Sequence, residues 1–450
     1  MKRWTLRLAL ALALGGHASV RAAAPVPTAP PAPADATDED AGASDAAAPT
    51  PAPTPAPAPT PAPRAAPRPT TPPPGLSPAD AMAWDAGRLL DEGQLAAAEA
   101  KANAAVATDG RSAEAHLALG RALFLRGDLT KALQEANMAL AINARHVGAL
   151  YLVLRIQAAQ GTAQQSHGRL QELANSHRDD LGVQLAYGEV QLLALKHDEA
   201  TAAVGRVLKK AETSVAAMKL LARVYLSLKR PMTAEYVLQR ALELERDPEV
   251  LTLLAGVRFG ESKVVEARVL LEEAVALAPG FLEALNSLGV VYIAVHNYDA
   301  AVEVLQRAVA GAPGFAEAWL DLGAAQRGAG AFEVAEASWK KTLALDPKQV
   351  KAWFNLGVLY LENPLPGRDR IKQLTDAISA FNGYKSGAGA ATDPEADKYI
   401  GEARLLLKQE EDRRKEQLKT PPPPTDGGGE GGEGGEGEGS GEPEGEAAEG

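Results

Sequence analysis

A pattern of residue types that recurs with a period of about 34 positions constrains the fold of this chain more than any other feature. Within one period an aromatic or apolar residue stands at position 4, Leu at position 7, Gly or Ala at position 8, and Ala again at position 20. Positions 4, 7, 8 and 11 fall on one face of a helix, and positions 20, 24 and 27 on one face of a second helix. Each period therefore predicts a helix-turn-helix unit, and the repetition predicts a stack of such units.

Nine repeats fit this register. They are 79–112, 113–146, 147–180, 181–214, 215–247, 248–281, 282–315, 316–349 and a ninth from Val350. Small residues at positions 8 and 20 let the two helices of a repeat approach closely. Leu154 stands at position 8 of the third repeat, so the sequence does not determine how the two helices of that repeat pack. The fifth repeat is one residue short. In the ninth, Ala377 stands eight residues late, which predicts a longer loop or a longer second helix.

These residues, over roughly 79–386, resemble the tetratricopeptide repeat (TPR) family. The resemblance implies an all-α, right-handed superhelical solenoid over 77–386. Its concave wall would come from the first helix of each repeat, at positions 2, 5, 9, 12 and 13. A helix within 387–419, apolar on one side and charged on the other, is expected to cap the solenoid, because an end repeat must cover its hydrophobic face.

The two ends of the chain differ in composition from the repeats. Residues 1–22 carry basic residues, a short apolar run at 8–14 and a small-residue cleavage pattern, which predicts a signal peptide, with a frayed amphipathic helix as the alternative. Residues 23–76 are Ala/Pro-rich and predict a disordered linker, either a spacer or a mere tether. Residues 420–450 form a Gly/Glu-rich acidic tail, expected to be disordered and solubilising or to bind a basic partner.

Export and the absence of cysteine together predict the location. With no cysteine, disulfides, thiolate metal sites and a lipid anchor are excluded. No segment after the signal has the length of a membrane span. We therefore expect a soluble periplasmic protein after cleavage, with secretion or association with the outer membrane left open.

Charge argues against nucleic acid as a partner. Of the net charge of −12, the first 22 residues carry +4 and the last 31 carry −9, which leaves −7 for 23–419. No basic arm or domain is present to attract a polyanion.

The residues expected on the concave wall predict its partner. In the N-terminal half the candidates combine arginine with apolar and aromatic residues: Leu117, Arg121, Phe124, Tyr151, Arg155, Glu189 and Arg223. Such a wall suits an acidic-hydrophobic peptide, although these arginines are equally typical of a solvated face and Glu189 would pair with one of them. The C-terminal half is more apolar, with Asn286, Val290 and Phe354, and suits a hydrophobic helix or a second protomer.

Nothing in the sequence indicates catalysis, a cofactor or a metal site. The seven histidines are scattered, and no phosphate-binding loop or nucleophile motif is present. The sequence predicts a non-enzymatic scaffold or adaptor for envelope proteins, of unknown oligomeric state. The extended ninth repeat, over 363–385, is similar to envelope repeat proteins of myxobacterial gliding machinery. The alternative function is a periplasmic holdase or assembly factor for exported or outer-membrane clients.

Overall fold

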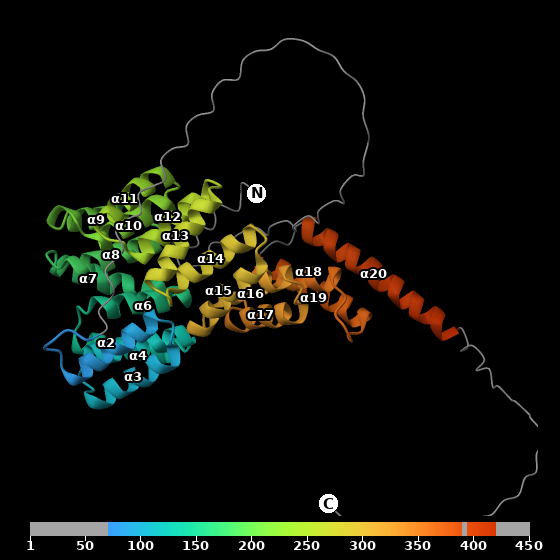
Figure 1. The fold of residues 1–450 in the computed structure, drawn as a ribbon, viewed down its shortest axis with the longest axis horizontal. Helices are drawn as coiled ribbons and strands as arrows, with labels where there is room; N and C mark the ends of the chain where they lie inside the picture. Colours follow the sequence, from blue (N-terminus) through green and yellow to red (C-terminus); the bar gives the residue numbers. More distant parts are fainter. Residues whose placement is uncertain (1–70, 389–393, 420–450) are drawn as a thin grey trace, which may run out of the picture.

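The computed structural model describes residues 71–388 and 394–419, and the secondary structure of this part is helical. Figure 1 shows the helices stacked side by side along a curved path. The expected all-α solenoid is confirmed. The expected signal peptide, most of the Ala/Pro-rich linker and the Gly/Glu-rich tail lie outside the described residues.

In the described part of the chain, nine helix pairs follow one another in the order that the repeat pattern predicts. The first helices are α2 (Pro78–Asp91), α4 (Ala113–Arg126), α6 (Val147–Ala159), α8 (Leu181–Leu193), α10 (Val215–Ser227), α12 (Pro248–Gly260), α14 (Leu282–Ala294), α16 (Ala316–Gly328) and α18 (Val350–Glu362). The second helices are α3 (Leu95–Thr108), α5 (Leu129–Ile142), α7 (His167–Ser176), α9 (His197–Lys210), α11 (Pro231–Leu244), α13 (Val264–Leu277), α15 (Tyr298–Gly311), α17 (Phe332–Leu345) and α19 (Arg370–Ala388). A short 3₁₀ turn η1 (Ala163–Ser166) precedes α7, and α20 (Pro394–Lys419) follows the ninth pair.

The turn between the two helices of a repeat has the same backbone conformation in the first eight of these repeats. One residue in each adopts a positive φ: Gly93, Gly127, Gly161, Leu195, Lys229, Ser262, His296 and Gly330. Successive members follow at one full repeat period, except that Ser262 comes one position early after Lys229. The fifth repeat is therefore one residue short, as predicted.

Small residues at position 8 are required by the close approach of the two helices. A Cβ added to Gly323 would lie 2.5 Å from Nε1 of Trp339, and one added to Gly357 would lie 2.7 Å from Cε1 of Phe381. Both rings are fully buried on the second helix of the same repeat. In the last three repeats, at Gly289, Gly323 and Gly357, a large side chain of the second helix thus covers the backbone of the first at position 8.

The third repeat departs from this geometry. Leu154 is buried at position 8, where other repeats carry Gly or Ala. The second helix of this repeat starts as the 3₁₀ turn η1, and α7 has 10 residues against 14 in α5 and α9. The larger side chain at position 8 and the irregular start of the second helix thus occur in the same repeat, the one whose packing the sequence left open.

The extra residues of the ninth repeat are shared between a loop and a helix. The connection 363–369 replaces the shorter 329–331 of the eighth repeat, and α19 starts about one turn earlier relative to Ala377 than α17 does relative to Ala335. The loop is held in place: Arg370 donates to the carbonyl oxygens of Tyr360 and Leu361, at 2.8 and 2.6 Å. Both of the predicted alternatives are therefore present.

Helix α20 covers the last repeat. Tyr399 stacks on Phe381 with ring centroids 5.4 Å apart, and Phe354 meets the edges of both rings. Arg414, near the other end of α20, pairs with Asp369 at 3.1 Å, so the helix runs along the length of α19. The sequence predicted such a capping helix, and its apolar side faces the solenoid.

The curvature of the solenoid brings its beginning against its later repeats. The backbone N–H of Gly280 donates to the carbonyl oxygen of Asp91 at 2.8 Å, and that of Gly314 donates to Leu125 at 3.0 Å. In Figure 1 the blue and cyan helices of the first repeats adjoin the yellow helices α14 and α15. The first superhelical turn therefore closes on itself.

Candidate protein-binding groove

The predicted arginine column lies on the inner wall of this closed turn, and each of its arginines faces a carboxylate of the same chain. Nη2 of Arg121 lies 3.8 Å from Oδ1 of Asp91. Arg155, in the third repeat, lies 3.1 Å from Glu283 in the seventh. The Arg155–Glu283 pair joins walls that are far apart in the sequence.

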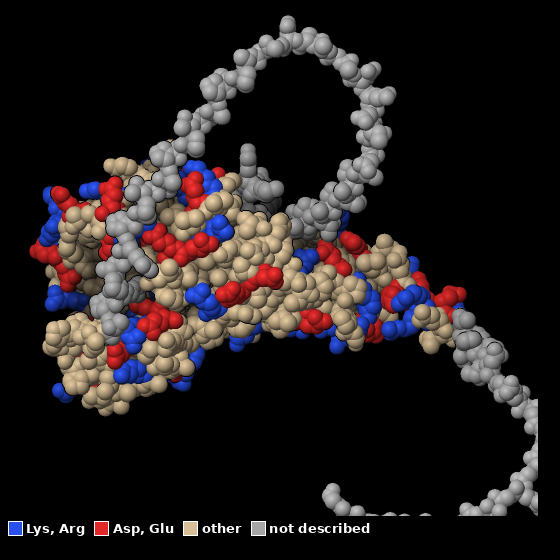
Figure 2. All heavy atoms as spheres, viewed as in Figure 1, with Lys and Arg blue, Asp and Glu red and all other residues tan. Residues whose placement is uncertain are grey.

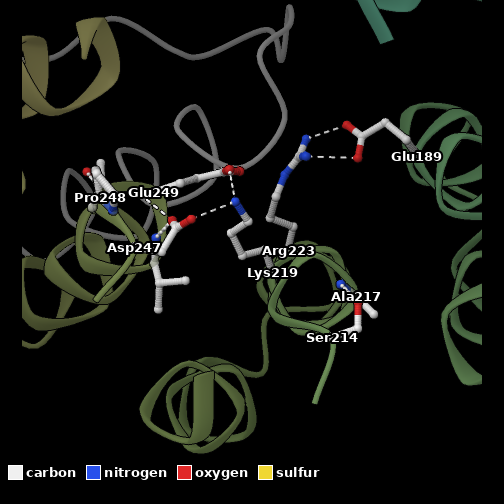
Figure 3. A network of polar contacts seen from close by, with 10 residues as sticks. Glu189, Ser214, Ala217, Lys219, Arg223, Asp247, Pro248 and Glu249 are labelled. Atoms are coloured by element: carbon white, nitrogen blue, oxygen red, sulfur yellow. Dashed lines mark hydrogen bonds and ion pairs between the residues drawn. The ribbon is translucent and has the colours of Figure 1, made fainter. Parts of the chain in front are cut away.

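Arg223 and Glu189 form the most enclosed pair of the column. Their side chains are 17% and 10% exposed, and their closest N–O distance is 2.7 Å (Figure 3). Burial disfavours the charged guanidinium, but Glu189 and Glu249 outweigh it and raise the pKa of Arg223 above its usual range. Glu189 is thus the structural partner of Arg223 that the sequence left as an alternative to peptide binding.

Lys219 extends the same network. Its Nζ lies 3.1 Å from Asp247 and 2.8 Å from Glu249, as Figure 3 shows. Burial opposes the charge of Lys219, but the two carboxylates raise its pKa. The sequence analysis did not predict that acidic residues line this wall. One sequence signal does indicate them: Glu249, Glu283 and Glu317 stand at position 2 of three successive repeats.

The apolar candidates lie between the charged ones. Leu117 is partly buried and packs over the backbone of Gly148 in the next repeat. The guanidinium of Arg155 lies 5.1 Å from the centroid of Phe124, within range of a cation–π interaction. Tyr151 is partly buried, and that burial raises the pKa of its hydroxyl. Leu117, Phe124, Tyr151 and the paired arginines therefore lie together along one wall.

One hollow inside the closed turn lies among these paired charges. A hollow of about 250 Å³ is bordered by Arg121, Arg155 and Lys219 on one side and by Asp247, Glu249 and Glu283 on the other. Ligand pockets for drug-sized molecules usually measure about 300–1,000 Å³. The hollow is thus smaller than a typical drug-sized pocket, and cationic and anionic side chains both line it.

The C-terminal candidates are placed differently from one another. Val290 is half-buried. Asn286 is buried, and its Nδ2 donates to Asp321 at 3.0 Å. Phe354 lies in the core beneath α20 and not on an open wall.

Two carboxylates missed by the sequence interpretation accompany Asn286. Desolvation by the surrounding protein raises the pKa of the half-buried Asp321 and of Glu317, whose side chain stays exposed, and the nearby Asp321 raises that of Glu317 further. This wall is therefore less apolar than the sequence predicted. Over the face seen in Figure 2, acidic and basic side chains are interspersed.

Models of known families identify the repeat. The tetratricopeptide repeat matches at residues 86–147 and 320–394, and a second model of the same description matches at 258–326. The chain contains tetratricopeptide repeats. No curated protein matches its sequence.

Solved structures resemble the TPR solenoid in fold. The Cut9 complex titled "APC/C hetero-tetramer Cut9-Hcn1" gives a TM-score of 0.52 at 18% identity, over 73% of this chain. The chain spans 63% of the length of that structure. MamA of Desulfovibrio magneticus RS-1 matches 40% of this chain and 97% of its own, at 22% identity and a TM-score of 0.34. At 18% identity, the likeness to the Cut9 structure concerns the fold alone.

Neither a metal cluster nor a membrane-spanning helix occurs in the described part of the chain. Within 71–388 and 394–419, no three side chains of His, Asp or Glu gather as a metal ion would require. Nor does any helix in these ranges combine the length and the apolar run needed to cross a bilayer.

Proposed function

We propose that the chain is an exported scaffold or adaptor that aligns protein partners in a bacterial envelope complex. The observation that carries the proposal is the solenoid of TPR helix pairs with charged and aromatic side chains along its inner wall. TPR proteins typically act as non-enzymatic scaffolds, and concave solenoid walls are extended binding surfaces. The signal-like residues 1–22 support export. The ninth-repeat resemblance supports an envelope machine such as that of gliding motility.

An acidic-hydrophobic segment is the partner that this wall fits best. Arg155 keeps 55% of its side chain exposed and lies over Phe124, and Arg121 is about half exposed. Carboxylates of a partner could replace Asp91 and Glu283 on these two arginines, while an apolar side chain packs against Phe124. Arg223 contributes less to such a site, because it is enclosed with Glu189.

In-cell crosslinking of a tagged chain, followed by mass spectrometry, tests this function. The groove variant carries Arg121→Glu and Arg155→Glu. The matched control carries Lys131→Glu and Arg240→Glu, which change the same charge at exposed positions of α5 and α11. We expect one or two envelope proteins in near-constant ratio with the native chain and the control, and their loss with the groove variant. Equal recovery from groove and control variants would refute the proposed wall.

A holdase is the alternative function, and one surface favours it. Met232 and Tyr236 on α11 are 80% and 73% exposed, and Val265 and Val269 on α13 are also exposed. The two pairs occupy equivalent positions in adjacent repeats. Exposed apolar residues gathered in this way suit transient contacts with unfolded clients.

Suppression of aggregation distinguishes the two functions. A holdase should keep an unrelated unfolding protein, such as heated citrate synthase, in solution, and Met232→Glu with Tyr236→Glu should abolish that protection. The native chain of a dedicated scaffold should give no protection, and the same double substitution should leave its crosslinked partners unchanged.

A further inference from the structure

The contact that closes the first superhelical turn is made at two equivalent places. Gly93 faces Gly280, and Gly127 faces Gly314. The second contact repeats the first one repeat further along both walls. Each contact brings one backbone hydrogen bond, from Gly280 to Asp91 and from Gly314 to Leu125. We call these two glycine contacts, together with the Arg155–Glu283 ion pair, the latch.

The latch depends on glycine at these positions. A Cβ built on Gly280 would overlap the backbone of Gly93, and one built on Gly314 would overlap the backbone of Gly127. A Cβ on Gly127 would lie 2.9 Å from Cα of Gly314. Backbone lies against backbone here, so even an alanine would push the two walls apart.

The latch is also the least extensive interface of the closed turn. Neighbouring repeats share continuous clusters of buried Ala, Leu and Val, such as the one formed around Leu251, Leu285 and Leu305. Across the latch, one apolar contribution comes from the partly buried Leu125, which packs against that cluster. A solenoid whose repeats contact mainly their neighbours can change its curvature through many small rotations. The latch is thus where the closed turn would separate first.

Closure has a direct effect on the inner wall. It brings the carboxylate of Glu283 onto Arg155, and it leaves the hollow of about 250 Å³ between the two walls. Asp247 and Glu249, at the start of α12, meanwhile pair with Lys219. In the closed turn the chain's own acidic side chains therefore occupy the cationic wall.

We infer that the latch is an autoinhibitory contact: the closed turn blocks the Arg121–Arg155 wall, and an acidic segment binds there only when the Gly93–Gly280 and Gly127–Gly314 contacts separate. The opening of the latch is independent of the identity of any partner. The acidic segment rests on the proposed function.

Cysteine crosslinking measures closure without a partner. Because the chain contains no cysteine, Arg155→Cys with Glu283→Cys gives a unique pair across the latch for a short bismaleimide. Arg155→Cys with Arg240→Cys, where Arg240 lies exposed on α11, is the pair that should not react. Lys219→Cys with Asp247→Cys joins α10 to the start of α12 and reports whether these helices stay folded.

Each pair is placed in the native background, in Gly280→Ala with Gly314→Ala, and in Gly205→Ala. A Cβ at Gly205 meets no atom within 4 Å, so that variant is a control for glycine replacement. We expect the latch pair to crosslink in the native and Gly205→Ala chains and to lose most of its crosslinking in the double alanine variant. The Lys219/Asp247 pair should react in all three. Equal latch crosslinking in the double alanine variant would overturn the inference.

A fluorescein-labelled peptide of alternating Glu and Leu tests the blocked wall. The double alanine variant should bind it about tenfold more tightly than the native chain, since the competent fraction is no longer limiting. Cysteines at Gly93 and Gly280 cannot be used to lock the closed turn, because any side chain at these two positions disrupts the latch. Closure is instead locked through Glu92→Cys with Pro279→Cys, exposed neighbours of the Gly93–Gly280 contact that leave Arg121 and Arg155 intact, and binding is compared with the same double variant before crosslinking.

Loss of peptide binding on locking supports autoinhibition, and unchanged binding overturns it. If the latch opens in the double alanine variant but the peptide binds to no form, the conformational inference stands and the acidic partner is wrong. Cysteine crosslinking therefore tests the latch, and peptide binding separately tests the proposed acidic partner.

Discussion

At the scale of single residues, the turn between the paired helices shows a local conflict between sequence and backbone. Leu195 adopts a φ of 57° and is 61% exposed, where Gly93, Gly127 and Gly161 stand in earlier repeats. The left-handed conformation costs a residue with a Cβ about 1–2 kcal/mol, and glycine avoids that cost. Leu195 thus stores strain that its few contacts do not offset.

We predict that Leu195→Gly raises the free energy of unfolding by about 0.5–1 kcal/mol, since relief of strain is partly offset by the greater freedom of glycine in the unfolded chain. Urea denaturation followed by circular dichroism measures the change. Leu195→Ala keeps the Cβ and should give no gain. An equal gain from alanine would show that removal of exposed apolar surface, and not backbone strain, is responsible.

Glu336 is a buried charge whose partners come from three places in the chain. Its side chain is 6% exposed and accepts from the Tyr360 hydroxyl at 2.6 Å, while Arg368 in the ninth-repeat loop pairs with it at 2.8 Å. Burial alone would raise the pKa of Glu336, but the hydrogen bonds from Arg368, Lys340 and Tyr360 lower it to about 2. The ionised carboxylate therefore anchors the loop to α17.

Because the folded-state pKa of Glu336 lies below its usual value of 4.5, its stabilisation is complete above about pH 4.5 and is lost as the pH falls toward 2. We predict that Glu336→Gln lowers the free energy of unfolding by about 2 kcal/mol at pH 7, as expected for hydrogen bonds to a charged group. Thermal melts from pH 7 to 2.5 should converge for the two chains at low pH. The exposed Glu333→Gln serves as control. A constant difference at all pH values would contradict this role.

At the scale of helices, position 8 decides how closely the pair in each repeat packs. Gly323 lies under the ring of Trp339, whose Nε1 donates to the carbonyl oxygen of Leu320 at 3.0 Å. Trp339 is fully buried and cannot move aside without losing that hydrogen bond. The spacing between α16 and α17 is therefore set by the absence of a side chain at Gly323.

We predict that Gly323→Ala lowers the free energy of unfolding by about 1–3 kcal/mol, because the added methyl overpacks against Trp339. Gly205→Ala, in the middle of α9 with no neighbour near its Cβ, should instead raise it by about 0.5–1 kcal/mol. The two variants share the same chemical change, so opposite shifts in the urea midpoint isolate packing from helix propensity. A shift of the same sign in both would refute the packing argument.

The helices were largely predictable because each repeat carries its pattern locally. Gly and Ala at position 8, the shortened fifth repeat and the late Ala377 each indicated a structural feature that is present. The division of the ninth-repeat insertion was not predictable, since it depends on Arg370 bonding to the end of α18. The same holds for Phe354, which the pattern placed on a wall although α20 covers it.

At the scale of the whole molecule, the sequence predicted which helices form the inner wall. It could not predict that the turn closes and pairs the charged residues of that wall. The repeat pattern predicted Arg121, Arg155 and Arg223 on one surface; in the structure Arg121 and Arg155 border one hollow, and Arg223 pairs with Glu189. The pairing across the turn depends on the accumulated rotation of several repeats, since Arg155 and Glu283 are 128 residues apart in sequence. A small change in the rotation per repeat would leave these two residues apart, and one repeat's sequence does not determine that rotation.

The closing helix offers a prediction about the whole solenoid. Deletion of 394–419 together with the tail would uncover Phe354, Phe381 and Tyr384, which α20 and its Tyr399 now cover. Burial of one large aromatic side chain is worth about 3–5 kcal/mol. The matched control ends at Lys419 and lacks only the tail. Because stability in a solenoid is passed between neighbouring repeats, the loss should be greatest in α18 and α19 and weaken toward the first repeats.

We expect amide hydrogen exchange to become fast in α18 and α19 of the shortened chain, while α2 to α13, joined through the latch and their own clusters, stay protected. The uncovered aromatic surface should also make the shortened chain self-associate, which light scattering would detect. Tyr399→Ala should reproduce a milder form of both effects with the helix still present. If the shortened chain stays monomeric and α18 exchanges as slowly as in the control, α20 is not a cap, and its charged outer side must be explained by contacts with another molecule.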